Sequence, residues 1–257
     1  MPGVIGRVAA VWRYPVKSMA GEALAAGFLG FAGVYGDRVY AFRKDAGPAG
    51  FPFLTGRDRA EMLLLRPRFR DPAAILAPPD LLAAESLGPG LTPLYAGAEA
   101  FAVEVVTPEK EVLAVDSPAL LARLGGGAVL LRSERALTDC RPVSLISAGT
   151  IAALAAEVGR GLDARRFRAN FYLDLDAAGF AEAGLIGTRL RLGAKAEVMV
   201  LERDPRCKMI TLDPDTAEAD PAILRHVARA HGGFAGVYGA VLVEGMVEAG
   251  DAVTRLD

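Results

Sequence analysis

The 257-residue sequence contains few of the side chains that most often build metal sites: two cysteines, Cys140 and Cys207, and two histidines, His226 and His231. Two thiols form one disulfide at most, and they cannot supply the four ligands of an iron–sulfur cluster or of a structural zinc site. Two histidines likewise exclude a histidine-rich metal site. Any chemistry must therefore depend on Cys207, on arginine, lysine and aspartate side chains, or on a bound cofactor.

Long apolar runs and an excess of one charge are also missing. No run approaches the roughly 20 apolar residues that a membrane-spanning helix needs, and the N-terminal residues 1–19 lack the apolar core and cleavage site of a signal peptide. The net charge is −2, with 29 basic and 31 acidic residues interspersed, so no basic stripe exists for a nucleic-acid backbone. We therefore expect a cytoplasmic protein that binds neither a membrane nor a nucleic acid.

The composition is that of a folded globule, since 52% of the residues are hydrophobic. Short β-type runs follow one another as hairpin-like pairs and do not alternate with helices. The longer helices are expected in the second half, at 148–158 and 221–231. We predict an α+β, β-rich fold: an N-terminal β-barrel-like domain, residues 1–115, followed by a β-barrel domain with peripheral helices, residues 116–257.

Cys207 lies between Arg206 and Lys208, before a short apolar β-type run that ends in the turn signal Asp213-Pro214-Asp215. Flanking cations favour the thiolate, which is the form that ligates a metal or acts as a nucleophile. Spacing alone also fits two plainer interpretations. Cys207 is then a small buried hydrophobe, and its charged neighbours form a solvated face.

Lys17 and Ser18 lie at the end of an expected strand over residues 4–12. They are either an ordinary exposed pair or a phosphate-binding corner built from an ammonium group, a hydroxyl and backbone amides. Arg38 follows a Gly-Asp pair and enters a further expected strand. It is either a solvated turn residue or a planar donor that reaches inward to an anion.

Two later stretches also carry candidate anion ligands. Ser147 opens the helix 148–158, where free backbone N–H groups attract an anion, although it is equally an N-cap and nothing else. Arg168 and Asn170 belong to a run of arginines that is either surface charge or a binding segment. If that segment is extended, both side chains project on the face opposite to Phe167.

The order Arg-Cys, then Asp-Pro-x-Thr, at residues 206–216 resembles the cysteine motif of the MOSC family, named after the C-terminal part of molybdenum cofactor sulfurases. Three further stretches fit that family in the same order: Tyr14 to Ser18, Gly36 to Arg38 and Arg166 to Asn170. Together they resemble the two-domain MOSC proteins that include the mitochondrial amidoxime-reducing component and its bacterial relatives. The resemblance implies a MOSC N-terminal β-barrel domain followed by a MOSC domain.

The resemblance implies a molybdenum–molybdopterin cofactor, with Cys207 as the catalytic metal ligand, and an oxidoreductase that reduces N-hydroxylated compounds. Asp213 is expected to organise the substrate or a proton donor, or equally to cap its own turn. The expected cofactor-binding residues are Lys17, Ser18, Arg38, Ser147, Arg168, Asn170 and Arg206.

Two alternatives use the same cysteine: a sulfur carrier or transferase that holds a Cys207 persulfide, and a cofactor-binding module without turnover. For the oxidoreductase, no Gly-x-Gly-x-x-Gly fingerprint occurs and the two cysteines cannot hold a cluster. Its electrons must therefore come from a separate donor protein.

Overall fold

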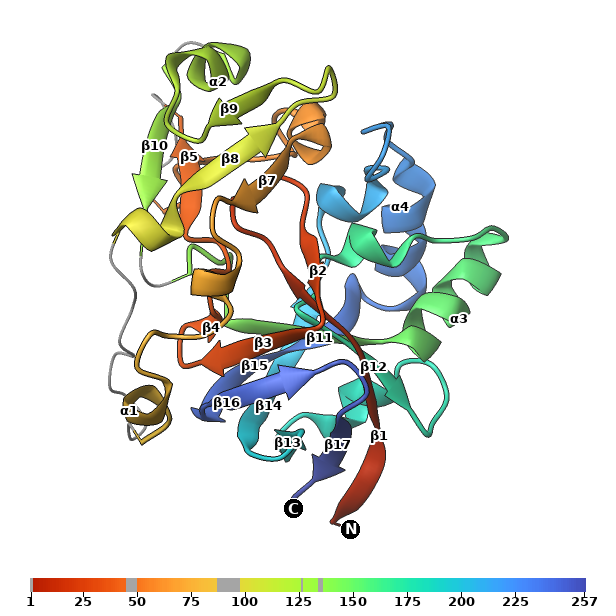
Figure 1. Cartoon of the computed structure of the whole chain (residues 1–257). Helices are drawn as coiled ribbons and strands as arrows, with labels where there is room; N and C mark the ends of the chain where they lie inside the picture. The colour runs from red at the N-terminus through yellow and green to blue at the C-terminus, as the bar shows by residue number, and fades with distance from the viewer. Residues whose placement is uncertain (1, 45–49, 87–97, 126, 134–135) are drawn as a thin grey trace.

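The computed structural model describes residues 2–44, 50–86, 98–125, 127–133 and 136–257. Its centre is a closed barrel of seven strands in the order β12-β11-β15-β14-β13-β17-β1, with β1 pairing back to β12 (Figure 1). These strands are β1 (Gly3–Arg13), β11 (Val143–Ser147), β12 (Phe171–Leu175), β13 (Arg189–Leu192), β14 (Ala196–Pro205), β15 (Phe234–Val243) and β17 (Ala252–Arg255). The predicted strand-rich α+β fold is confirmed.

Strand β1 closes this barrel, although all the other barrel strands come from the second half of the chain. It pairs antiparallel with β12 on one side and with β17 on the other, where Gly3 faces Arg255. The N- and C-termini consequently lie side by side (Figure 1). The buried apolar side chains of β1, Val8 and Val11, join the apolar cluster inside the barrel. They lie three residues apart because a register shift between Val8 and Ala10 interrupts the alternation of the strand.

Short strands build three smaller sheets, two of which again join distant parts of the chain. In both of these sheets a strand from before residue 116 pairs with a strand from after it. The domain boundary at residue 116 stays a prediction. The sheets are β16 (Gly245–Glu248), β3 (Ala26–Gly30) and β4 (Gly33–Val34); β10 (Val129–Arg132), β5 (Tyr40–Arg43) and β6 (Phe53–Leu54); and β7 (Arg66–Phe69), β8 (Val103–Val106) and β9 (Val112–Ala114). Strand β2 (Glu22–Leu24) pairs with β1.

Helices α3 (Ala148–Val158) and α4 (Pro221–Ala230) lie together against one side of the barrel (Figure 1). They share an apolar cluster to which Leu154 and Val227 contribute fully buried side chains. The two shorter α-helices are α1 (Leu81–Ser86) and α2 (Pro118–Arg123). The 3-10 helices are η1 (Ala60–Leu64), η2 (Ala73–Ile75), η3 (Ala98–Phe101), η4 (Ala164–Phe167), η5 (Ala181–Leu185) and η6 (Lys208–Thr211). Within the described ranges, no helix is long and apolar enough to cross a membrane.

Two segments near Cys207 differ from the sequence prediction. The apolar run after Cys207 is the 3-10 helix η6 and not a strand; Thr211 Oγ1 donates a 2.7 Å hydrogen bond to the Lys208 carbonyl three residues before it, which favours this turn. The segment before Asn170 is not extended either. Residues 164–167 form η4, and Arg168 adopts a left-handed conformation.

Candidate functional site

Seven of the nine residues nominated from the sequence line one cavity beside the end of β14. They are Lys17, Ser18, Arg38, Arg168, Asn170, Arg206 and Cys207. These residues come from four separate stretches of the chain. The barrel brings the stretches together, because Lys17 follows the end of β1, Asn170 precedes the start of β12 and Arg206 follows the end of β14. Their convergence is a property of the structure, whereas their roles remain predictions.

Ser147 lies outside the residues that line this cavity. Its hydroxyl accepts a 3.0 Å hydrogen bond from the Thr150 backbone N–H, which makes it the N-cap of α3. Its backbone N–H points to the buried carboxylate of Glu182, at 3.3 Å. Because this carboxylate already occupies the helix N-terminus, an anionic ligand would be repelled there. The placement favours the capping interpretation over cofactor binding.

Replacing Ser147 by alanine is therefore expected to destabilise the protein without changing the cavity. Loss of an N-cap costs about 0.5–2 kcal/mol, and the buried Thr150 hydroxyl would also lose its 3.0 Å contact with Ser147. Urea unfolding of the two proteins measures the difference. An unchanged unfolding midpoint would contradict the capping role.

Asp213 also lies outside the residues that line the cavity. One carboxylate oxygen accepts hydrogen bonds from the backbone N–H groups of Asp215 and Thr216, at 3.0 and 3.1 Å. The other accepts a 2.7 Å hydrogen bond from Arg166, whose side chain does line the cavity. The structure thus supports the turn-capping interpretation of Asp213. Asp213 can affect the cavity only indirectly, because its carboxylate holds the Arg166 side chain in position.

The cavity lining carries more positive than negative charge. Its cationic residues are Lys17, Arg38, Arg141, Arg166, Arg168 and Arg206, and its carboxylates are Asp139 and Asp204. Cations gathered around a concave surface attract anions, and the partly desolvated setting strengthens that attraction relative to bulk water. The lining therefore suits an anionic ligand.

Three guanidinium nitrogens of these arginines are buried without a hydrogen-bond partner in the described part of the chain: Arg166 Nε, Arg168 Nη2 and Arg206 Nη2. Arg206 Nη2 does lie 2.9 Å from Asp204 Oδ2 as an ion pair, but without hydrogen-bond geometry. An unsatisfied buried donor costs about 1–3 kcal/mol, and a charged one costs more. Donors of this kind fit a bound phosphate or a similar acceptor-rich group.

The backbone of the cavity is held in uncommon conformations. Ser18, Arg38 and Arg168 have positive φ angles of 66°, 46° and 53°. Such conformations cost about 1–3 kcal/mol each and persist where the surroundings enforce them. Here the Tyr14 ring is a shared support, because the guanidinium groups of Arg38 and Arg168 lie 4.7 and 4.3 Å from its centroid. The two arginines are therefore positioned before any ligand binds.

Lys17 is nearly buried and already has partners. Its ammonium donates a 2.7 Å hydrogen bond to the Leu137 carbonyl and forms an ion pair with Asp139. Burial lowers the pKa of Lys17, and the Asp139 charge opposes this shift. Burial alone would raise the pKa of Asp139, but Lys17, with Arg38 and Arg57, outweighs burial and the carboxyl pKa is lowered. A ligand phosphate would therefore share Lys17 with Asp139.

Cys207 presents a free, half-buried thiol to the cavity. Of its two cationic neighbours, only Arg206 lines the same cavity; its guanidinium is fixed by the carbonyls of Ala235 and Phe167, at 2.6 and 2.8 Å. Lys208 turns away and donates to the Arg57 carbonyl at 3.0 Å. Cys140 is exposed and contacts Glu202.

A buried polar group beside Cys207 was not singled out from the sequence. Ser144 Oγ donates a 2.7 Å hydrogen bond to Asp204, and Tyr238 lines the cavity with them. Burial raises the pKa of Asp204 in spite of Arg206, and burial together with Asp204 raises the pKa of Tyr238. In the sequence Asp204 lies three residues before Cys207, and Tyr238 is a residue of strand β15.

Two family models match the chain: "MOSC domain" over residues 132–254 and "MOSC N-terminal beta barrel domain" over residues 5–88.

Among solved structures, the YuaD protein from Bacillus subtilis is 14% identical, with 100% of both chains covered and a TM-score of 0.50. YiiM from Geobacillus stearothermophilus is 20% identical, with a TM-score of 0.37, over 46% of this chain and 55% of its own. YiiM from Escherichia coli is 18% identical, with a TM-score of 0.33 and the same coverage. The chain thus spans about half the length of the YiiM chains. No curated protein matches it.

Proposed function

Starting from the finding that the chain belongs to the MOSC family, with both an N-terminal MOSC barrel domain and a MOSC domain, we propose that it is a molybdenum-cofactor-dependent oxidoreductase. MOSC domains are associated with binding of the molybdenum cofactor and with sulfurase-like proteins. The proposed substrates are small N-hydroxylated compounds, with Cys207 as the molybdenum ligand.

The observation that carries this proposal is the set of buried, unpartnered guanidinium nitrogens that line the cavity with Cys207. A phosphate-bearing pterin would accept hydrogen bonds from Arg168, and Arg38 and Ser18 lie in the same lining. The Cys207 thiolate is a soft ligand, which suits a thiolate-rich metal centre. When bound, such a centre supplies oxygen-atom transfer coupled to two electrons.

Reduction of an N–OH group to N–H consumes two electrons and two protons and releases water. The chain's own residues would deliver the protons. Asp204 is suited to this role because burial raises its pKa, so it holds a proton more readily than an exposed carboxyl. Asp213 would help to organise the substrate only indirectly, because it holds Arg166 in position.

The electron donor is proposed to be a separate protein. Cys140 and Cys207 are both free cysteines. Cys140 is exposed, and Cys207 lines the cavity. A sulfur carrier with a Cys207 persulfide remains the alternative function. That function needs the thiol but gives no role to the unpartnered nitrogen of Arg168, which is why the cofactor-binding proposal is favoured.

Arg168→Met tests the cofactor site in protein made by a host that synthesises the molybdenum cofactor. The wild type should contain molybdenum near one per chain, together with pterin. A hydrogen bond to a charged group contributes about 1.5–3 kcal/mol, so Arg168→Met should retain roughly tenfold less of both, and Arg168→Lys an intermediate amount. Metal analysis and pterin fluorescence measure the contents.

Arg165→Met is the matched control. Arg165 is a neighbouring arginine whose partners are Asp163 and Asp215, and it is not part of the cavity lining. The control should keep the wild-type content. Equal contents in the Arg168 variant and the wild type would place the cofactor elsewhere, and well-folded wild-type protein with neither molybdenum nor pterin would favour the sulfur carrier.

A further inference from the structure

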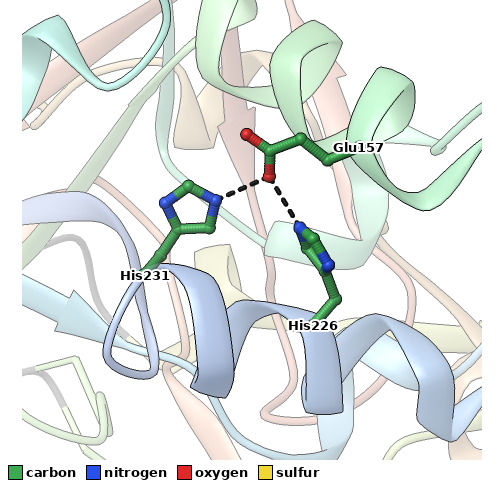
Figure 2. Close-up of side chains that lie close together, drawn as sticks. All are labelled: Glu157, His226 and His231. Atoms are coloured by element: carbon green, nitrogen blue, oxygen red, sulfur yellow. Dashed lines mark hydrogen bonds and ion pairs between the residues drawn. The ribbon is translucent and has the colours of Figure 1, made fainter.

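Three ligand-type side chains meet where α3 faces α4: Glu157, His226 and His231 (Figure 2). The Nε2 atoms of His226 and His231 lie 2.7 and 2.6 Å from the same oxygen, Glu157 Oε2. We propose that these three residues form a binding site for a transition-metal dication of the zinc class. This site is independent of the cavity that contains Cys207.

The donor set fits such an ion. Imidazole nitrogen and carboxylate oxygen bind Zn²⁺ at about 2.0–2.2 Å, and the three candidate ligand atoms lie within 4.8 Å of one another. One ion can therefore contact all three after small side-chain rotations. Two histidines and one glutamate leave a fourth position for water, as in other three-ligand zinc sites.

The two helices hold these ligands at a fixed spacing. Glu157 is in the last turn of α3, and His226 is in the middle of α4. The buried side chains of Leu154 and Val227 belong to one apolar cluster beneath them, so core packing sets the distance between the helices. A site built on two packed helices loses little conformational freedom when the ion binds.

The third ligand is oriented by its own contacts. The His231 ring stacks on Phe180, with ring centroids 4.0 Å apart and an interplanar angle of 18°. On a regular helix His231 would lie about 140° around the axis from His226. However, His231 is the C-cap of α4, with φ −124° and ψ 17°, and it leaves the helical path. This departure brings both imidazoles to Glu157 (Figure 2).

An ion can reach the cluster from solvent. The side chains of Glu157, His226 and His231 retain 35%, 30% and 18% of their accessible surface. The plainer alternative is that two imidazoles donate hydrogen bonds to one carboxylate with no metal involved. Hydrogen bonds from His231 and then His226 do lower the pKa of Glu157. The two alternatives differ in whether the cluster binds a metal.

Zinc titration by calorimetry tests the proposal in the full chain carrying Cys140→Ser and Cys207→Ser, which removes the two competing thiols. One equivalent of Zn²⁺ should bind and raise the thermal midpoint. Adding Glu157→Gln or His226→Gln should weaken binding by about tenfold or more, since even an outer-shell change near a metal typically costs 10–100-fold. Glu218→Gln, at an exposed glutamate outside the cluster, should bind like its parent.

Co²⁺ provides a spectroscopic probe of the same variants. The parent should show visible d–d bands that disappear in His226→Gln, while both metal-free proteins keep the same thermal midpoint. If the parent binds no zinc, or if the Glu157 and His226 variants bind it as tightly as the parent, the cluster is a hydrogen-bonded contact between helices and the proposal is wrong. None of these outcomes depends on the molybdenum cofactor.

Discussion

Cys207→Ser is expected to remain folded but to lose its molybdenum and its reductase activity. Serine keeps the shape of cysteine, yet its hydroxyl is hard and poorly ionised where a soft anionic ligand is required. Because the metal ligand itself is lost, activity should fall by at least about 100-fold, beyond the 10–100-fold effect of an outer-shell change. Turnover of an N-hydroxylated compound with a strong artificial reductant measures the loss.

The same variant separates metal binding from pterin binding. The guanidinium groups that would bind the phosphate do not use the sulfur, so pterin content should fall less than molybdenum content. Cys140→Ser is the matched control, because Cys140 is exposed and is not part of the cavity lining. That control should keep full activity. Reduced nicotinamide alone should support no turnover in any of these proteins.

Two results would remove the oxidoreductase assignment. The first is full activity in Cys207→Ser. The second is molybdenum-loaded wild-type protein that reduces no N-hydroxylated compound with strong artificial donors. A persulfide on Cys207 in protein that lacks molybdenum would instead support the sulfur carrier.

Gly6→Ala is expected to destabilise the whole fold by about 3 kcal/mol or more, at or above the upper end of the usual penalty for overpacking. A Cβ atom on Gly6 would lie 2.1 Å from the Asp174 carbonyl oxygen and 2.8 Å from the Leu175 Cα. Both atoms belong to the backbone of β12, so no side-chain rotation relieves the clash. The φ of +154° adds strain.

The effect should be global because of where Gly6 lies. It pairs with Leu175 of β12 and with Val253 of β17, and β1 is the strand that closes the barrel between them. Separating β1 from β12 would expose the apolar interior. Urea unfolding followed by circular dichroism measures the change.

Gly161→Ala is the matched control for this glycine substitution. A Cβ at Gly161 meets nothing within 4 Å, and its φ lies outside the left-handed range. Its free energy of unfolding should stay within about 0.5 kcal/mol of the wild type. Equal unfolding midpoints for Gly6→Ala and Gly161→Ala would show that the pairing of β1 with β12 and β17 does not constrain the barrel.

Local sequence signals determined several elements of this protein. The helical spacing of Ile151 and Leu154 predicted α3 over residues 148–158, which is its observed span. The sequence also carries a capping residue followed by proline at the starts of α2 and α4, and its β-type runs at residues 101–106 and 111–115 contain the hairpin of β8 and β9. These elements depend on hydrogen bonds and side-chain contacts a few residues apart, which the sequence displays directly.

The candidate site was predicted by a different route. Composition and spacing left Lys17, Arg38 and Cys207 open between ordinary and functional roles, and only the resemblance to a family grouped them. The convergence of these residues on one cavity is a tertiary result. It depends on β1, β12 and β14 meeting in one barrel, and such long-range pairing is decided by burial and strand register across the whole chain.

The features that the sequence did not show are long-range for the same reason. Arg168 adopts a left-handed conformation because its guanidinium stacks on Tyr14 and donates to the Met19 carbonyl, both about 150 residues away. Glu157 meets His231 across 74 residues, and only after the C-cap has turned the ring from its helical direction. Sequence periodicity describes one element at a time, and the packing of separate elements decides which side chains share a site.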